Sequence, residues 1–319
     1  MNKLLKVIAA SALVATALVG CSGKEAPIAK AGLGIVTSDV AESYGNMQVN
    51  TTFAVVGLDK DGKIVDVKVD VAQSSPAAED AKTTSKKDLK EEYGMKSTSA
   101  SIGAIEGGAE WYEQIAKFEE YCIGKTADEV AAIETETNAE GHASAKAGTD
   151  LAAGCTMAIG DFQAAVAKAC ENAVEVEAET VNVGYVMNVG TDYSGNGQLN
   201  TTVTMLAEDA DGKIVAAKVD VAQISAVLGA DTRSKAEKKE DYGMKSTSAS
   251  IGAIEGGAEW YEQAAAFETA IVGMTAADVA AIETETNAEG NASPKAGTDL
   301  AAGCTMAIGD FQAAIANAK

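Results

Sequence analysis

Alternating apolar and polar positions around a short turn occur twice along the chain. In VNTTFAVVGLDKDGKIVDVKVDVAQ (residues 49–73), β-branched runs flank DKDGK, and Gly62 occupies the turn position that needs a positive φ. LNTTVTMLAEDADGKIVAAKVDVAQ (residues 199–223) repeats the pattern, with Gly212 in the turn. Each stretch predicts an antiparallel β-hairpin, so the front part of each half is expected to be sheet.

Apolar residues at helical spacing follow each hairpin. In AEWYEQIAKFEEY, the side chains of Trp111, Ile115 and Phe118 fall on one face of a predicted helix. TADEVAAI opens with Thr126 and carries Glu129 three residues later, which is the spacing of an N-terminal capping box. After a polar loop, GDFQAAVAKA is again helical in pattern. We therefore expect an α+β fold in which a small antiparallel sheet packs with helices in each half.

The two halves are copies of one unit. Residues 93–114 are identical to 242–263, and TDLAAGCTMAIGDFQAA occurs at 149–165 and again at 298–314. The hairpin regions, in contrast, agree at only half of their positions. Each copy has about 145 residues, which is the size of a domain rather than of a solenoid repeat. We expect two tandem homologous domains.

The first 20 residues have the pattern of a secretory signal. Lys3 and Lys6 precede an apolar run over residues 7–19, too short for a membrane-spanning helix of about 20 residues. The run ends in LVGC, which resembles the lipobox of bacterial lipoproteins. This resemblance implies that Cys21 is acylated and anchors the chain to the outer face of the cell membrane. The alternative is an ordinary signal with an incidental cysteine.

These patterns divide the chain into four segments. They are a lipoprotein signal peptide (1–20), a lipid-anchored linker (21–31), a first domain (32–176) and a second domain (177–319). The offset between the copies is 150 residues in the front part and 149 in the back part, so one residue was gained or lost between them.

Composition excludes several classes of function. The formal net charge is −22, whereas binding to a phosphate backbone needs a basic surface, so nucleic acid is excluded as a partner. The single histidine, His142, is replaced by Asn291 in the second copy, so no Ser/His/Asp triad can form there. Glycine loops of Walker or Rossmann spacing are absent from the sequence.

A Gly-Cys-Thr sequence precedes the last predicted helix of each half. It consists of Gly154, Cys155 and Thr156 in the first copy and Gly303, Cys304 and Thr305 in the second. We expect both threonines at the start of a helix, where free amide donors and the helix dipole favour a phosphate group. Two interpretations follow from this position. The hydroxyl either caps the helix or carries a phosphate ester.

The same segment resembles the flavinylation motif D-x-x-[S/T/A]-[G/S]-A-T of FMN-binding domains. The matching residues are Asp150, Gly154 and Thr156 in the first copy and Asp299, Gly303 and Thr305 in the second, with Cys155 and Cys304 replacing the usual alanine. The hairpins, the YGMK…EWYEQ…FE block and the TMAIGDFQAA tail resemble duplicated flavin lipoproteins of extracellular electron transfer, over nearly the whole mature chain. The resemblance implies two FMN-binding domains with two covalent FMN groups. An ApbE-type flavin transferase would attach them by phosphoester bonds to Thr156 and Thr305.

This resemblance implies a membrane-anchored extracellular electron carrier. It would take electrons from a membrane NADH dehydrogenase or quinone-linked donor and pass them to extracellular acceptors such as ferric iron or soluble flavin. The flavin does the redox chemistry, and the protein holds it and tunes its potential. Two alternatives stay open. One is a surface flavin reductase with a defined organic acceptor, and the other is a lipoprotein that binds a ligand without redox chemistry.

Aromatic and basic residues near the motif have two interpretations each. Trp111 and Trp260 either line an isoalloxazine ring or fill the core between helix and sheet. Lys96 and Lys245 either balance the charge of the phosphate or of the reduced flavin, or are solvated.

The remaining candidates for a disulfide or a ligand site are two cysteines and two acidic loops. Cys122 and Cys170 occur only in the first copy, so they form either a disulfide or two separate thiols. The acidic loops at 133–141 and 282–290 either bind a cation or are solvated.

Overall fold

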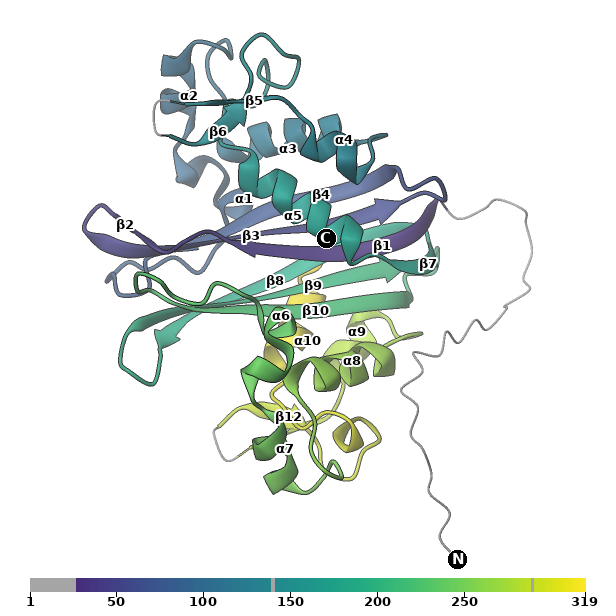
Figure 1. Cartoon of the computed structure of the whole chain (residues 1–319). Coiled ribbons are helices and arrows are strands. Elements are labelled where there is room, and N and C mark those ends of the chain that lie inside the picture. The colour runs from purple at the N-terminus through teal and green to yellow at the C-terminus, as the bar shows by residue number, and fades with distance from the viewer. Residues whose placement is uncertain (1–26, 139–140, 288–289) are drawn as a thin grey trace, which may run out of the picture.

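The computed structural model describes residues 27–138, 141–287 and 290–319 (Figure 1). The predicted signal peptide and Cys21 lie outside these residues. In the described ranges, no helix combines the length and the apolar character needed to cross a membrane. The predicted α+β fold with small antiparallel sheets and packed helices is confirmed.

Five antiparallel strands form the sheet of the first half. They are β1 (Ile28–Thr37), β2 (Ala41–Ser43), β3 (Asn46–Leu58), β4 (Ile64–Ser74) and β7 (Val174–Ala178). Strand β3 pairs with β1 and β4, its first residues pair with β2, and β1 pairs with β7 on its other side. The predicted hairpin is confirmed, because Asp59 N–H donates to Lys63 O at 2.9 Å and Gly62 has a φ of +76°.

Three strands form the sheet of the second half. They are β8 (Thr180–Thr191), β9 (Gly197–Glu208) and β10 (Ile214–Ser225), with β9 in the middle. The second predicted hairpin joins β9 to β10, and Gly212 in its turn has a φ of +72°.

The remaining elements follow in the same order in both halves. In the first half they are α1 (Lys86–Leu89), η1 (Lys90–Tyr93), α2 (Lys96–Ile102), α3 (Trp111–Cys122), α4 (Ala127–Ala131), β5 (Thr135–Thr137), β6 (Ala143–Ala145) and α5 (Gly160–Glu171). In the second half they are α6 (Lys235–Lys238), η2 (Lys239–Tyr242), α7 (Lys245–Ile251), α8 (Trp260–Ala270), α9 (Ala276–Ala280), β11 (Thr284–Thr286), β12 (Ala292–Pro294), η3 (Leu300–Ala302) and α10 (Gly309–Ala316).

Helix α3 confirms the predicted helical pattern. Its residues Trp111, Ile115 and Phe118 are all buried in one core cluster. The capping box predicted for α4 is also present, because the Thr126 side chain accepts from Glu129 N–H and the Glu129 side chain accepts from Thr126 N–H. The loop predicted after α4 differs from the expectation, since it holds the two-stranded ladder β5–β6.

Helix α5 packs directly on the backbone of β1. A Cβ atom added at Gly34 would lie 2.2 Å from the carbonyl oxygen of Ala165, and one added at Gly32 would lie 2.0 Å from that of Ala169. The alanine-rich sequence of α5 therefore serves close contact between a helix and a strand that lacks side chains at these positions.

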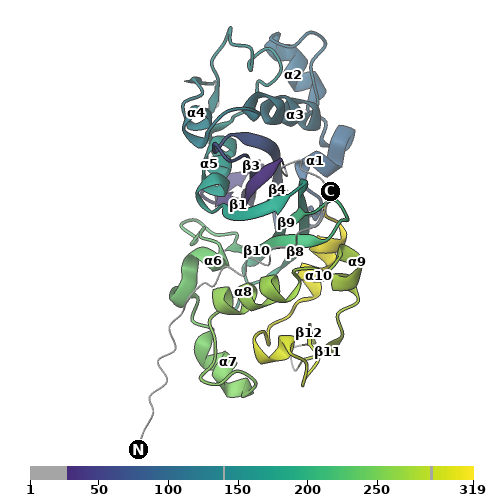
Figure 2. The same ribbon diagram turned by 90° about the vertical axis from the view of Figure 1, so that its right-hand side faces the viewer.

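The two sheets pack face to face, with the helices of each half on the outer sides (Figure 1, Figure 2). Apolar side chains from both sheets form one shared core, including Phe53 and Val55 from β3 and Val203 and Met205 from β9. The predicted boundary between 176 and 177 falls inside β7, which pairs with β1. Strand β1 begins at Ile28, so the last residues of the predicted linker belong to the sheet. The division into two domains stays a prediction.

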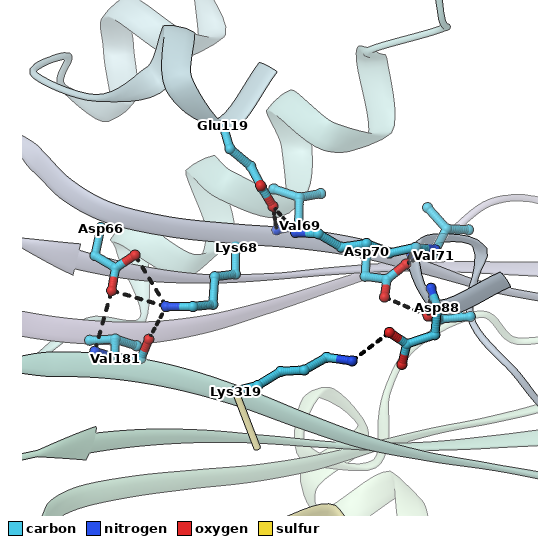
Figure 3. Close-up of polar contacts among 11 residues, drawn as sticks. Asp66, Lys68, Val69, Asp70, Val71, Asp88, Glu119, Val181 and Lys319 are labelled. Carbon is cyan, nitrogen blue, oxygen red and sulfur yellow. Dashed lines mark hydrogen bonds and ion pairs between the residues drawn. The ribbon is translucent and has the colours of Figure 1, made fainter. Parts of the chain in front are cut away.

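Polar contacts join the two halves at the edges of the sandwich (Figure 3). Lys68 Nζ contacts both carboxylate oxygens of Asp66 and donates to the carbonyl oxygen of Val181 on β8. Lys319, the last residue, forms an ion pair with Asp88. These contacts and the shared core hold the two sheets in one arrangement.

Candidate functional site

The Gly-Cys-Thr motif lies in an irregular segment between β6 and α5. Its first two residues close a turn, in which the amides of Gly154 and Cys155 donate to the carbonyl oxygen of Leu151 at 3.0 and 2.8 Å. Thr156 itself lies four residues before Gly160, where α5 begins, and the helix is preceded by Ile159 with no side-chain cap. The second copy has the same arrangement, with α10 beginning at Gly309.

The prediction that the motif threonine lies at the start of the helix is therefore wrong. The physical reason is that Ile159 N–H donates to the carbonyl oxygen of Ala143 at 2.8 Å, which ties the segment to β6 before the helix can begin. Met157 and Ile159 are also buried, so these residues anchor an irregular stretch in the core. A helix-capping role for the Thr156 hydroxyl is excluded by this geometry.

A buried glutamine of α3 holds the motif threonine. Both the amide N–H and the hydroxyl of Thr156 donate to Gln114 Oε1, at 2.9 and 3.1 Å. Gln114 has no exposed surface, and its Nε2 donates to the carbonyl oxygen of Ala109 at 3.0 Å and to Met95 Sδ at 3.8 Å. Thr156 is half-buried. Its side chain is thus fixed from inside the protein and remains partly open to solvent.

The second copy repeats this network. Gln263 Oε1 accepts from the amide and the hydroxyl of Thr305 at 2.8 and 3.1 Å, and its Nε2 donates to Ala258 O and Met244 Sδ. Sequence reasoning missed both glutamines. The available signal was a polar residue three positions after the tryptophan on the apolar face of the helix, inside the identical block of residues.

The motif cysteines are buried thiols. Cys155 and Cys304 have no exposed surface, and burial raises the pKa of Cys155 to about 11 and that of Cys304 to about 12. Both thiols are therefore protonated at neutral pH. They fill the alanine position as small core side chains and offer no thiolate to a cofactor.

A surface hollow of about 380 Å³ borders the motif in the first half. Its lining includes Asp150 and Gly154 of the motif and Lys117 and Lys125 of the neighbouring α3 region. The motif aspartates Asp150 and Asp299 are both exposed. The second half has Ala266 and Met274 at the two lysine positions, so the surroundings of the two motifs differ in charge.

The two predicted tryptophans lie in the core. Trp111 is 3 % exposed and meets Phe162 of α5 edge to face, with ring centroids 6.0 Å apart. Trp260 has the same exposure and the same contact with Phe311 at 6.3 Å. For either indole to line a flavin, part of its ring would have to become exposed. Lys96 and Lys245 are exposed at the starts of α2 and α7.

A different lysine is partly enclosed in the first half. Lys86 Nζ lies 5.3 Å from the ring centroid of Tyr93, and burial lowers the pKa of Lys86 to about 8. Together with Gln73, both residues line a hollow of about 400 Å³ in the first half. Its counterpart Lys235 lies over the rings of Tyr242 and Trp260. Sequence reasoning did not select these lysines, because nothing in the pattern sets them apart from other lysines.

Cys122 and Cys170 are free thiols in the structure, so the disulfide interpretation is wrong for this state of the chain. Burial raises the pKa of Cys122 to about 12 and that of Cys170 to about 11. His142 is an exposed loop residue. Across the described ranges, no group of three or more His, Cys, Asp or Glu side chains is placed to hold a metal ion.

The group that accepts the hydrogen bond of the Thr156 hydroxyl is not a general base. The acceptor of Thr156 Oγ1 is an amide oxygen, which is too weak a base to take the proton of an attacking hydroxyl. A reaction at this oxygen therefore needs a base other than Gln114.

Comparisons with protein-family models, curated proteins and solved structures found no match to the chain.

Proposed function

We propose that the chain is a membrane-anchored extracellular electron carrier with two covalent FMN groups, one on Thr156 and one on Thr305. The observation that carries the proposal is the doubled D-x-x-A-G-C-T motif, whose threonine is held in the same way in both halves. Each threonine is half-buried, whereas the residues on both sides of it are buried. Because the threonine is the half-buried residue between two buried neighbours, its hydroxyl is the group that we propose as the attachment point.

The hydrogen-bond partner of the hydroxyl supports modification by a separate enzyme. Because the hydroxyl of Thr156 faces an amide, an ApbE-type flavin transferase would have to supply both the activated flavin and the base. The bound FMN would supply the redox chemistry, and the chain would hold it. Covalent attachment suits an extracellular location, because a tethered cofactor stays at high effective concentration in its site.

The proposed partners follow from this role. Electrons come from a membrane NADH dehydrogenase or quinone-linked donor and leave to ferric iron, soluble flavin or another extracellular acceptor. The lipid on Cys21 keeps the carrier at the outer face of the cell membrane.

The decisive experiment is co-expression of residues 21–319 with an active ApbE-type transferase, followed by intact-mass measurement. We expect two FMN mass increments in the wild type, one in each of the single variants Thr156→Ala and Thr305→Ala, and none in the double variant. If the wild type shows no increment while the same transferase modifies another substrate, the proposal is wrong.

The reductase alternative has one observation in its favour. The hollow of about 400 Å³ beside Tyr93 could admit a small organic acceptor. In the second half, Arg233 stands at the position of Thr84, which lines this hollow in the first half, and it pairs with Asp231 and Asp241. A reductase would show saturable turnover with one organic acceptor, whereas a carrier would exchange electrons with many. A lipoprotein that binds a ligand without redox chemistry would acquire no FMN increment.

A further inference from the structure

One side-chain oxygen accepts two hydrogen bonds from one threonine, in both halves. The Thr156 amide and hydroxyl meet Gln114 Oε1, and those of Thr305 meet Gln263 Oε1, with distances between 2.8 and 3.1 Å. The two partners are 42 residues apart in sequence in each half. The contact therefore depends on the packing of the motif segment against α3 and α8.

The orientation of the glutamine amide is fixed by its other end. Gln114 Nε2 donates to Ala109 O and Met95 Sδ, and these groups have no hydrogen to donate in return. A flipped amide would place its NH₂ group against the Thr156 N–H and leave its oxygen facing the Ala109 carbonyl. Oε1 must therefore face the threonine.

This orientation decides where the hydroxyl proton of the threonine points. Because Gln114 Oε1 can only accept, Thr156 Oγ1 donates its hydrogen toward the protein interior. The lone pairs of Oγ1 are then directed away from Gln114. The same oxygen also holds the Thr156 amide, so the side-chain rotamer and the backbone are fixed together. The hydroxyl oxygen is preorganised to act as a nucleophile.

Burying a glutamine on the apolar face of α3 costs desolvation free energy, and holding the threonine gives a reason for that cost. Gln114 lies on the face of α3 that also buries Trp111 and Phe118, and neither it nor Gln263 has any exposed surface. A buried amide is stable only when its polar atoms find partners. An apolar side chain would fill this position of the helix without that requirement.

We propose that Gln114 and Gln263 are positioning residues for transfer of FMN to Thr156 and Thr305. This inference rests on the proposed function. Oγ1 of the threonine attacks the phosphorus of the FMN half of a flavin adenine dinucleotide held by the transferase, and an Oγ1–P bond forms. The P–O bond to the adenylyl half breaks, and adenosine monophosphate leaves with the bonding electrons. The hydroxyl first rotates about the Cβ–Oγ1 bond away from Gln114 Oε1, and its proton then passes to a base of the transferase, while the Thr156 amide keeps its hydrogen bond to Gln114 Oε1. No group is oxidised or reduced.

The test measures both sites within one molecule. The purified chain is incubated with the transferase and flavin adenine dinucleotide, and peptide mass mapping follows the modification of Thr156 and Thr305 over time. In Gln114→Met, which keeps the length but removes the acceptor, we expect the rate at Thr156 to fall at least tenfold while the rate at Thr305 is unchanged. Gln263→Met is the matched control and should give the reverse result.

A second variant separates positioning from a purely structural role. Gln114→Glu keeps oxygens that accept from the Thr156 amide and hydroxyl but loses the donor to Ala109 O. We expect it to recover most of the rate at Thr156, although a buried carboxylate lowers the melting temperature more than methionine does. Equal losses in the Met and Glu variants, or losses that follow the melting temperature, would overturn the inference.

The result distinguishes the inference from the function on which it rests. Two increments in the wild type, together with a wild-type rate at Thr156 in Gln114→Met, would overturn the positioning role alone. No increment in the wild type, with the transferase active on another substrate, would overturn both.

Discussion

Tyr185 of the second half donates its hydroxyl to the carboxylate of Asp88 in the first half, with 2.8 Å between the oxygens. The same hydroxyl accepts from Ser85 N–H at 3.1 Å, and Asp88 also pairs with Lys319. Burial opposes ionisation of Asp88, but the hydrogen bonds from Lys319 and Tyr185 outweigh it and lower the pKa of Asp88. One tyrosine of β8 thus links the sheet of the second half to helix α1 of the first half through a charged group.

Removing this hydroxyl should weaken the fold. In Tyr185→Phe the Ser85 amide loses its acceptor and Asp88 loses a donor, so we expect the free energy of unfolding to fall by about 2 kcal/mol. Chemical denaturation measures the change. Tyr193→Phe is the matched control, because Tyr193 is fully exposed, and it should change stability by less than about 0.5 kcal/mol. Equal effects of the two substitutions would contradict a structural role for the Tyr185 hydroxyl.

Close packing of α5 on β1 gives a second prediction. In Gly34→Ala the new methyl group would lie 2.2 Å from the Ala165 carbonyl oxygen, which is backbone and cannot move aside as a flexible side chain would. We expect a loss of about 3 kcal/mol in the free energy of unfolding. Gly190→Ala is the control, since nothing lies within 4 Å of the added Cβ there. A stable Gly34→Ala protein with an unchanged melting temperature would show that α5 lies farther from β1.

Patterns of neighbouring residues were sufficient to predict the individual turns, caps and helices. The turn at Gly62, the capping box of Thr126 and Glu129 and the buried face of α3 all depend on residues within a few positions of each other, and all are confirmed. The α+β class follows from these elements.

Features that depend on contacts between residues far apart in the sequence could not be predicted in the same way. The helix predicted over GDFQAAVAKA does begin at Gly160, but Thr156 lies outside it, because Ile159 N–H donates to the carbonyl oxygen of Ala143 on β6, a strand that the polar loop did not predict. Gln114 is 42 residues from Thr156, and no periodicity connects them. The face-to-face packing of the sheets was missed for a related reason. The expected fold pairs each sheet with the helices of its own half, whereas one face of β3 packs on the sheet of the other half.

Asp70 gives a prediction for the pH dependence of stability. Burial raises its pKa from 3.8 to about 6, against hydrogen bonds from the Ser85 hydroxyl and the Lys87 and Val71 amides. Between these two pKa values the folded chain binds a proton that the unfolded chain does not. The contribution of Asp70 to the free energy of unfolding therefore increases as the pH falls from 7, by about 1 kcal/mol at pH 5 and about 3 kcal/mol below pH 4.

The measurement compares the wild type with Asp70→Asn at pH 7 and pH 5. We expect the difference in unfolding free energy between the two proteins to shift by about 1 kcal/mol in favour of the wild type at pH 5. Asp61→Asn, which makes the same chemical change on the exposed hairpin turn, is measured beside it as the reference substitution. A difference that is the same at both pH values would mean that Asp70 keeps an ordinary pKa in the folded chain.

The buried thiols should be slow to react. Because burial raises the pKa values of Cys122, Cys155, Cys170 and Cys304 to about 11 or 12, very little thiolate exists at pH 8. Relative to the denatured chain, we expect alkylation by iodoacetamide at pH 8 to be at least about 100-fold slower. The measurement uses the chain from residue 22 onward, purified without reductant. Four reactive thiols should appear on denaturation, and only two would show that Cys122 and Cys170 are bonded to each other.

Separation of the two halves tests how far each is a domain of its own. Cutting between Ala178 and Glu179 keeps β7 with its partner β1 and leaves β8 as the first strand of the second piece. Each piece then exposes a sheet face that is buried in the intact chain. This face carries Phe53 in the first piece and Val203 in the second. Since an exposed apolar face of this kind drives association, we expect each piece alone to self-associate and an equimolar mixture to form a one-to-one complex. Analytical ultracentrifugation measures both.

One substitution that places a charge in the shared core tests whether the two pieces bind through this core or associate because each has lost stability. Val203→Asp places a carboxylate in the shared core, so the second piece should no longer bind the first. Val272→Asp makes the same chemical change at a position that is 51 % exposed and should leave the complex intact. Two monomeric, stably folded pieces with no affinity for each other would contradict the shared core. That result would show instead that each sheet is stabilised by its own helices alone, as the tandem repeat in the sequence first indicates.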